Sequence, residues 1–209
     1  MNLAMLHAPD GGARAMPADL ASLDAWFDRR LEEKIAERDA ARTKSLAIIA
    51  TKGTMDMAYP PFILASTAAA LGWNASIFFT FYGLELLKKD LSIKVSPLGN
   101  PAMPMKLPFG PEWLQQTNLP VPNFVAGNLP GFEGFATAMM EQTVKAKGIA
   151  SIKELRDICI ESGVRLLACQ MTVDLFSHRQ DEFIPEIAEW IGATSYLAEA
   201  QKADVCLFV

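Results

Sequence analysis

Residues 164–176, Val-Arg-Leu-Leu-Ala-Cys-Gln-Met-Thr-Val-Asp-Leu-Phe, decide how the chain folds. An apolar run short enough for a buried strand ends at Cys169, and a helical pattern resumes two or three residues later. Open α/β sheets place ligands and reactive groups at such turns. The following helix would aim unpaired N–H groups at the sulfur, which favours the nucleophilic thiolate. Cys169 is therefore the candidate reactive residue, and a buried, inert thiol is the alternative.

Composition limits the class of protein. The chain has 209 residues, of which 51% are hydrophobic and 21% charged, enough for one compact α/β domain with appendages. A net charge of −5 without a cluster of Lys and Arg argues against a nucleic-acid surface. Small molecules or proteins are the expected partners. Because His7 and His178 are the two histidines, a His-rich metal site is improbable.

Cysteine usage and the N-terminus indicate a compartment. Three cysteines without CxxC or Cys/His metal spacing suit a reducing environment better than a disulfide-stapled secreted fold. Residues 1–15 have no basic region followed by an apolar core, so a signal peptide is not expected. These features predict a cytoplasmic protein.

A stretch without charge, residues 57–84, is long enough to cross a bilayer. Pro60 and Pro61 lie near its start, and Gly72-Trp73-Asn74 divides it into an Ala-rich helix and a Phe-rich segment. A buried helix followed by a buried strand fits this division better than a membrane span, so no membrane insertion is expected.

Alternating apolar runs and helical patterns predict a mainly parallel sheet with right-handed crossovers. Strands are expected at 45–50, 75–81, 164–169 and 204–209. Helices are expected at 57–71, 83–89, 132–147, 151–162, 183–191 and 195–202. Ser151 and Glu154 have the spacing of a capping box, and Gly163 is placed to end that helix.

Two appendages accompany this domain of residues 45–209. The sequence of residues 1–44 predicts a loose arm followed by an amphipathic helix. The apolar positions of that helix are Leu20, Leu23, Phe27, Leu31 and Ile35. That helix either packs on its own domain or contacts another subunit. Residues 91–130 hold eight of the thirteen prolines and are expected to form a lid or an oligomerisation arm, with disorder as the alternative. The combined apolar surface predicts a homo-oligomer.

A loop follows the first strand and contains Lys52, Gly53 and Thr54. Helix N–H groups and a lysine can bind an anion at such a position. The spacing GxxxxGK[ST] of a phosphate-binding loop is missing, so a structural turn and an active-site wall both remain possible.

The other two cysteines have different expected roles. Cys159 lies one turn before Gly163, so strand and helix geometry place it more than ~10 Å from Cys169, too far for a disulfide. Cys206 lies in the middle of a predicted buried strand, where it is expected to be a small core residue.

Several segments together resemble the larger members of the DsrE/DsrF-like sulfur-carrier family. The segment Ala168-Cys169-Gln170-Met171-Thr172 is similar to the active-cysteine segment of that family. The resemblance extends over about 45–209 through these further segments: Lys52-Gly53-Thr54 with Asp56, Ala58-Tyr59-Pro60, Phe78 to Phe81 with Gly83-Leu84, Gly192-Ala193, Tyr196-Leu197 and Ala203-Asp204.

The resemblance implies a Rossmann-like three-layer domain, homo-oligomers and a sulfurtransferase or sulfur-carrier activity. It implies that Cys169 carries sulfane sulfur as a persulfide, with Lys52, Gly53, Thr54, Met171 and Thr172 as candidates for the substrate pocket. TusA-like small carriers and rhodanese-like proteins are the implied partners, without a metal or organic cofactor. The alternatives are a small-molecule or nucleotide-binding Rossmann-like module, or a scaffold subunit, in which Cys169 is incidental.

Overall fold

The computed structural model describes residues 19–96, 106, 110–117, 128 and 130–209. Two compact units divide the chain, Met1–Arg42 and Thr43–Val209. In the first unit, helix α1 spans Leu20–Ala41. Its N-cap is Asp19, whose side chain accepts a hydrogen bond from the backbone N–H of Ser22 at 2.9 Å. This contact satisfies one of the N–H groups that a helix leaves unpaired at its start.

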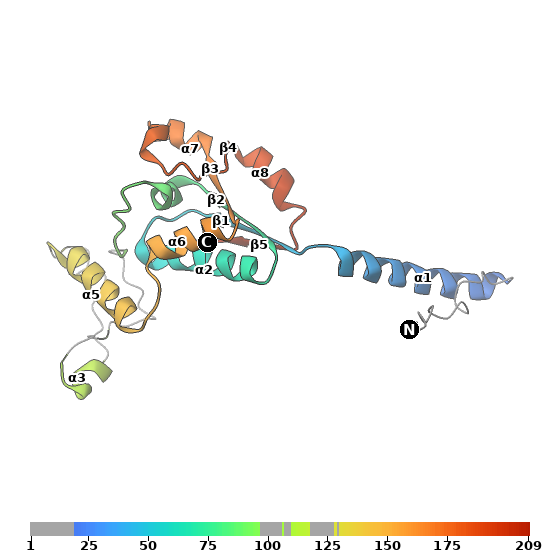
Figure 1. Ribbon diagram of the computed structural model, residues 1–209, viewed down its shortest axis with the longest axis horizontal. Coiled ribbons are helices and arrows are strands. Elements are labelled where there is room, and N and C mark those ends of the chain that lie inside the picture. The colour runs from blue at the N-terminus through green and yellow to red at the C-terminus, as the bar shows by residue number, and fades with distance from the viewer. Residues whose placement is uncertain (1–18, 97–105, 107–109, 118–127, 129) are drawn as a thin grey trace, which may run out of the picture. The chain divides into compact units, whose positions relative to one another are not determined.

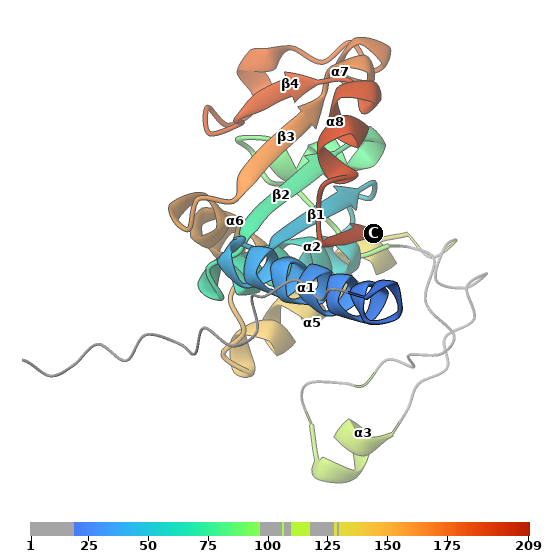
Figure 2. The same cartoon turned by 90° about the vertical axis from the view of Figure 1, so that its right-hand side faces the viewer.

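The second unit is built on a five-stranded sheet in the order β4-β3-β2-β1-β5, with every neighbouring pair parallel. The strands are β1 (Ser45–Ala50), β2 (Asn74–Phe79), β3 (Arg165–Cys169), β4 (Glu189–Ile191) and β5 (Val205–Phe208). Figure 2 shows them side by side. The α-helices of this unit are α2 (Met55–Ala70), α3 (Glu112–Gln116), α5 (Phe132–Ala146), α6 (Ile152–Glu161), α7 (Gln170–Leu175) and α8 (Ala193–Ala200), and the 3-10 helices are η2 (Phe81–Leu87) and η3 (Gln180–Glu182). The predicted α/β class with a mainly parallel sheet is confirmed.

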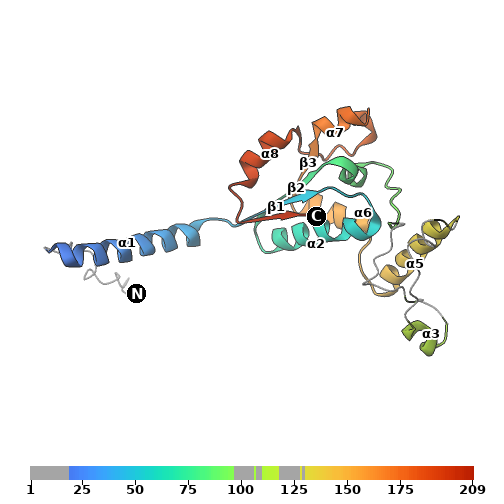
Figure 3. The same cartoon turned by 180° about the vertical axis from the view of Figure 1, so that it is seen from behind.

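Helices cover both faces of the sheet, which gives the three layers of a Rossmann-like domain. Figures 1 and 3 show α2 and α6 on one face and α7 and α8 on the other. The first face carries the larger core, in which the side chains of Ile48, Ile77 and Leu166 are completely buried beneath Phe62 and its neighbours. The second face carries a smaller cluster, which consists of Ala47, Phe78, Leu167, Cys169, Tyr196 and Ala200.

The uncharged stretch 57–84 is divided among α2, β2 and η2, as predicted. Among the described helices, none is long and apolar enough to cross a membrane. Strand β2 ends at Phe79 rather than at residue 81, because Phe81 adopts a left-handed backbone with φ 48° that a strand cannot contain. The capping box at Ser151 and Glu154 and the left-handed Gly163 after α6 are present as predicted.

The predicted helix at 183–191 is wrong. The backbone of this segment pairs with neighbouring elements instead: Ile184 donates its N–H to the carbonyl of Leu87 at 2.9 Å, and Ala188 donates to Leu166 at 2.8 Å. The segment then becomes the edge strand β4. Tertiary pairing therefore overrides an apolar spacing that resembled a helix.

Most of the predicted lid or arm at 91–130 lies outside the described residues. Within it, the structure describes residues 91–96, which follow η2, and the five-residue helix α3. The backbone N–H of Met55 donates to the carbonyl of Lys94 at 2.8 Å, so the start of this segment lies against the start of α2.

Candidate functional site

Cys169 occupies the predicted strand-to-helix turn. It is the last residue of β3 and the N-cap of α7, with an extended backbone at φ −75° and ψ 107°. Its neighbour in the sheet is Ile191 of β4, and the next residue, Gly192, is the N-cap of α8. The two helices α7 and α8 therefore both begin close to Cys169.

The side chain of Cys169 is buried, with 1% of its surface exposed. It belongs to the cluster on the second face of the sheet, together with Phe78 and Tyr196. The Tyr196 ring stacks on Phe78 with 4.5 Å between ring centroids, and its hydroxyl donates to the carbonyl of Ile48 at 3.0 Å. Burial raises the pKa of Tyr196, so its hydroxyl stays neutral and this packing is preserved at physiological pH.

Thr172 connects the turn after Cys169 to the end of β2. Its side chain is completely buried, its Oγ1 lies 3.1 Å from Oγ1 of Thr80, and it accepts the backbone N–H of Phe81 at 3.2 Å. Buried hydroxyls are costly unless they are hydrogen-bonded, so this arrangement holds the two loops together specifically. Thr172 therefore lies buried beneath the turn, and its predicted place in a substrate pocket stays a prediction.

The contact with Thr172 coincides with unusual backbone geometry. Phe81 has φ 48°, a conformation that costs a bulky residue of order 1–3 kcal/mol. Its N–H is the group that Thr172 accepts. The buried threonine therefore helps to hold Phe81 in this conformation, with 45% of the phenylalanine side chain exposed.

The predicted loop residues Lys52, Gly53 and Thr54 lie at the carboxyl end of β1, two strands from Cys169. The loop packs against η2 so closely that a Cβ on Gly53 would lie 2.3 Å from the carbonyl oxygen of Tyr82. Lys52 is exposed, and Thr54 is the N-cap of α2. This close packing of Gly53 fits the interpretation of the loop as a structural turn, and a role of Lys52, Gly53 and Thr54 in a substrate pocket stays a prediction.

Exposed apolar side chains surround the turn, and most of them were not predicted from the sequence. Tyr82 is 67% exposed and stacks on Phe176, while Leu175 and the predicted pocket residue Met171 are similarly exposed. These residues come from η2 and α7, which follow neighbouring strands. The signal that could have found them is the apolar content of two consecutive strand-to-helix turns, because parallel strands bring such turns to one edge.

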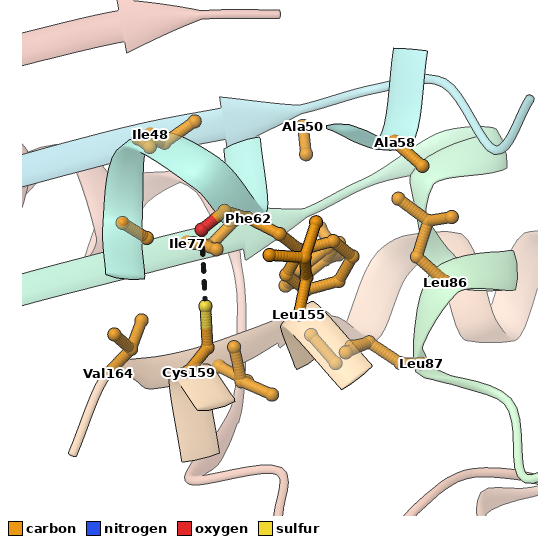
Figure 4. Close-up of a cluster of buried hydrophobic side chains, with 14 of the residues drawn as sticks. Ile48, Ala50, Ala58, Phe62, Ile77, Leu86, Leu87, Leu155, Cys159 and Val164 are labelled. Carbon is orange, nitrogen blue, oxygen red and sulfur yellow. Dashed lines mark hydrogen bonds between the residues drawn. The ribbon is translucent and has the colours of Figure 1, made fainter. Parts of the chain in front are cut away.

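Cys159 lies on the opposite face of the sheet from Cys169. Figure 4 shows its side chain pointing into the larger core, where its thiol donates to the carbonyl of Phe62 at 3.4 Å. Burial raises the pKa of Cys159 to about 12. Both thiols are free, and Cys159 stays protonated near neutral pH.

The predicted core position of Cys206 is wrong, because this residue is exposed. Strand β5 lies at the edge of the sheet, and its residues alternate between partly buried and exposed positions. Cys206 pairs with Ala47 on the second face, where Phe208 of the same strand is 75% exposed. The covering helix on this face does not bury the outer side of β5.

Comparison with known proteins places the chain in a family. Residues 42–208 match the DsrE/DsrF/DrsH-like family. The chain belongs to that family. It is 53% identical over 167 residues to the sulfur carrier protein DsrE2 of Allochromatium vinosum, an alignment that covers 79% of this chain and 98% of the relative. It is also 30% identical over 169 residues to the uncharacterized protein YrkE of Bacillus subtilis, which covers 80% of this chain and 98% of that protein.

Proposed function

We propose that this protein is a sulfur carrier that holds sulfane sulfur as a persulfide on Cys169. The observation that carries the proposal is the placement of Cys169 at the carboxyl end of β3, where α7 begins, in a chain 53% identical to a named sulfur carrier. Cys159 and Cys206 are weaker candidates for the persulfide. The thiol of Cys159 stays protonated in the core, and Cys206 lies on an edge strand.

The transfer consists of two exchanges in which sulfur moves without net oxidation. The thiolate of Cys169 attacks the outer sulfur of a donor persulfide, R–S–SH; the donor S–S bond breaks, and R–S⁻ leaves while Cys169–S–SH forms. An acceptor thiolate then attacks that outer sulfur, forms its own persulfide and releases the Cys169 thiolate. Each step breaks one S–S bond and makes one.

The burial of Cys169 defines what the exchange requires. Cys169, with 1% of its surface exposed, is shielded from solvent, and a donor persulfide or an acceptor thiol reaches its sulfur when the turn or the short helices beside it move. Both α7 and α8 are short, with six and eight residues, and Leu197 on α8 is 59% exposed. Local opening of these elements is therefore the proposed route to the sulfur.

The proposed donors and acceptors are proteins that present a thiol, of the rhodanese-like and TusA-like kinds that the resemblance implies, in a cytoplasmic relay. The exposed apolar side chains of Phe81, Tyr82, Met171 and Leu175 next to the turn support a protein partner, because such groups favour contact with another apolar surface.

The test is sulfur loading measured by intact-protein mass spectrometry. Reduced protein is incubated with a limiting amount of polysulfide in a Cys206→Ser background, because the exposed Cys206 could react without any relation to function. One added sulfur atom that dithiothreitol removes is expected. Cys169→Ser in that background should abolish the adduct, and Cys159→Ser should keep it. Loading that persists after Cys169→Ser and disappears after Cys159→Ser would show that the wrong cysteine has been assigned.

One observation favours a second candidate, a module that binds a small molecule. A cavity of about 990 Å³ lies between α2, α5 and α6 on the first face of the sheet, bordered by Met55, Ile93 and Val144. The hydroxyl of Tyr59 in its wall is buried without a hydrogen-bond partner among the described residues, and burial, Glu141 and Glu154 raise its pKa. Under this alternative Cys169 would react slowly with a thiol probe at every pH, whereas a carrier thiol would react rapidly once deprotonated.

A further inference from the structure

Helix α1 has an apolar stripe that the described residues of its own unit leave exposed. Phe27, Leu31 and Ile35 follow one another at steps of four residues, and their side chains are 58%, 47% and 42% exposed. The helix ends at Ala41, before the family match of 42–208 begins. The stripe therefore lies outside the domain that the chain shares with its family.

Charged residues border this stripe, with negative side chains along one side and positive side chains along the other. Asp24, Asp28 and Glu32 each come directly after a stripe residue, whereas Arg30 and Lys34 each come directly before one. Because successive residues are rotated by about 100° around a helix, the carboxylates lie along one border and the basic groups along the other.

We infer that α1 pairs through this stripe with α1 of a second copy, and that the two helices run in the same direction. In a parallel pair, the residues after the stripe of one helix face the residues before the stripe of its partner, so the acidic border meets the basic border twice. In an antiparallel pair, each border would face its own copy, and like charges would oppose each other.

The ion pairs within α1 do not prevent this arrangement. Arg30 contacts Glu33 at 2.6 Å and Lys34 contacts Glu37 at 2.5 Å, but these are pairs on one exposed helix and contribute little. The basic groups can turn toward carboxylates of the second copy. Because a row of i, i+4 steps winds around the helix, the contact is short and centred near Phe27 and Leu31 rather than extended as a long coiled coil.

The decisive experiment reverses one charged border at a time in the full chain. Sedimentation velocity over a range of concentrations, at low salt and with a reductant, measures the dissociation constant of the pair. Asp28→Lys with Glu32→Lys should raise that constant about tenfold or more, because these two carboxylates lie within two residues of the heights of Arg30 and Lys34 in an in-register parallel pair, so both contacts become repulsive. Arg30→Glu with Lys34→Glu should do the same, and mixing the two variants should restore association.

The control places an equal change of charge on the opposite side of the helix. Ala25→Lys, Ala36→Lys and Ala40→Lys with Asp39→Asn together add as much positive charge as the first variant and should leave association unchanged. Circular dichroism verifies that every variant keeps its helix.

Three results would overturn the inference. An unchanged dissociation constant in both border variants indicates an antiparallel pair or an interface without α1. A wild-type monomer, whose melting temperature falls after Leu31→Asp, indicates that the stripe packs on its own domain. Equal weakening by the control indicates a general effect of charge. None of these readouts depends on sulfur chemistry, so they fail or succeed independently of the role of Cys169.

Discussion

The two faces of the sheet carry one buried cysteine each, in very different surroundings. On the first face, α2 and α6 bury a large apolar core, and Cys159 is one of its components. On the second face, α8 contributes only Tyr196 and Ala200 to a small cluster that contains Cys169. The comparison teaches that two thiols with equal burial can lie under very different covers: α2 and α6, of 16 and 10 residues, cover Cys159, whereas α7 and α8, of six and eight residues, lie on the face of Cys169.

The largest expected effect is on folding stability. Phe62→Ala removes a completely buried ring that lies 5.8 Å from the ring of Phe79, and it should cost about 3–5 kcal/mol in the free energy of unfolding. Phe78→Ala on the second face should cost less, about 3 kcal/mol or below, because α8 can move into the space. Urea denaturation measures both. A larger loss for Phe78→Ala would contradict the difference between the faces.

The next effect concerns Thr172. Thr172→Val keeps the shape of the side chain but loses its contacts with Thr80 and the N–H of Phe81, at a cost of about 1–3 kcal/mol. Because these contacts hold the turn after Cys169, sulfur loading should also slow down. Thr172→Ser should restore the loading rate, since it keeps the hydroxyl. If valine and serine load at equal rates, the hydroxyl does not position the turn.

The last expected effect is absent at neutral pH and appears only at alkaline pH. The pKa of Cys159 is about 12 in the folded protein, above its value of about 8.5 in an unfolded chain. The unfolded state therefore loses this proton first, and the stability that Cys159 contributes falls as the pH rises from about 9 toward 12, by about 1.4 kcal/mol per pH unit. Cys159→Ser should lack this component. Parallel pH profiles of unfolding for the two proteins would contradict the deep burial of the thiol.

Most of the sheet could be predicted from the sequence, because four of its strands are apolar runs between helical patterns. The strand at 189–191 could not, since it is three residues long and is stabilised by pairing with β3 rather than by its own pattern. The exposure of Cys206 could not be predicted either. An edge strand and a central strand have similar composition, and strand order is determined by tertiary packing.

Only part of the candidate site could be predicted from the sequence. The position of Cys169 follows from one strand-to-helix turn, so local sequence was sufficient. The link from Thr172 to Thr80 joins residues 92 positions apart, and Thr172 also accepts the N–H of Phe81, whose backbone is left-handed. Neither has a local sequence signal, because each arises only when two parallel strands lie side by side.

The short edge strands have a consequence for how the protein behaves at high concentration. Strand β4 has three residues and β5 has four, so each edge of the sheet offers few N–H and C=O groups to another chain. Long, flat edges are the usual templates for strand-by-strand aggregation. The protein can therefore leave Phe208 and the side chains around Cys169 exposed with little risk of sheet extension, so its contacts with other molecules are left to side chains and helices.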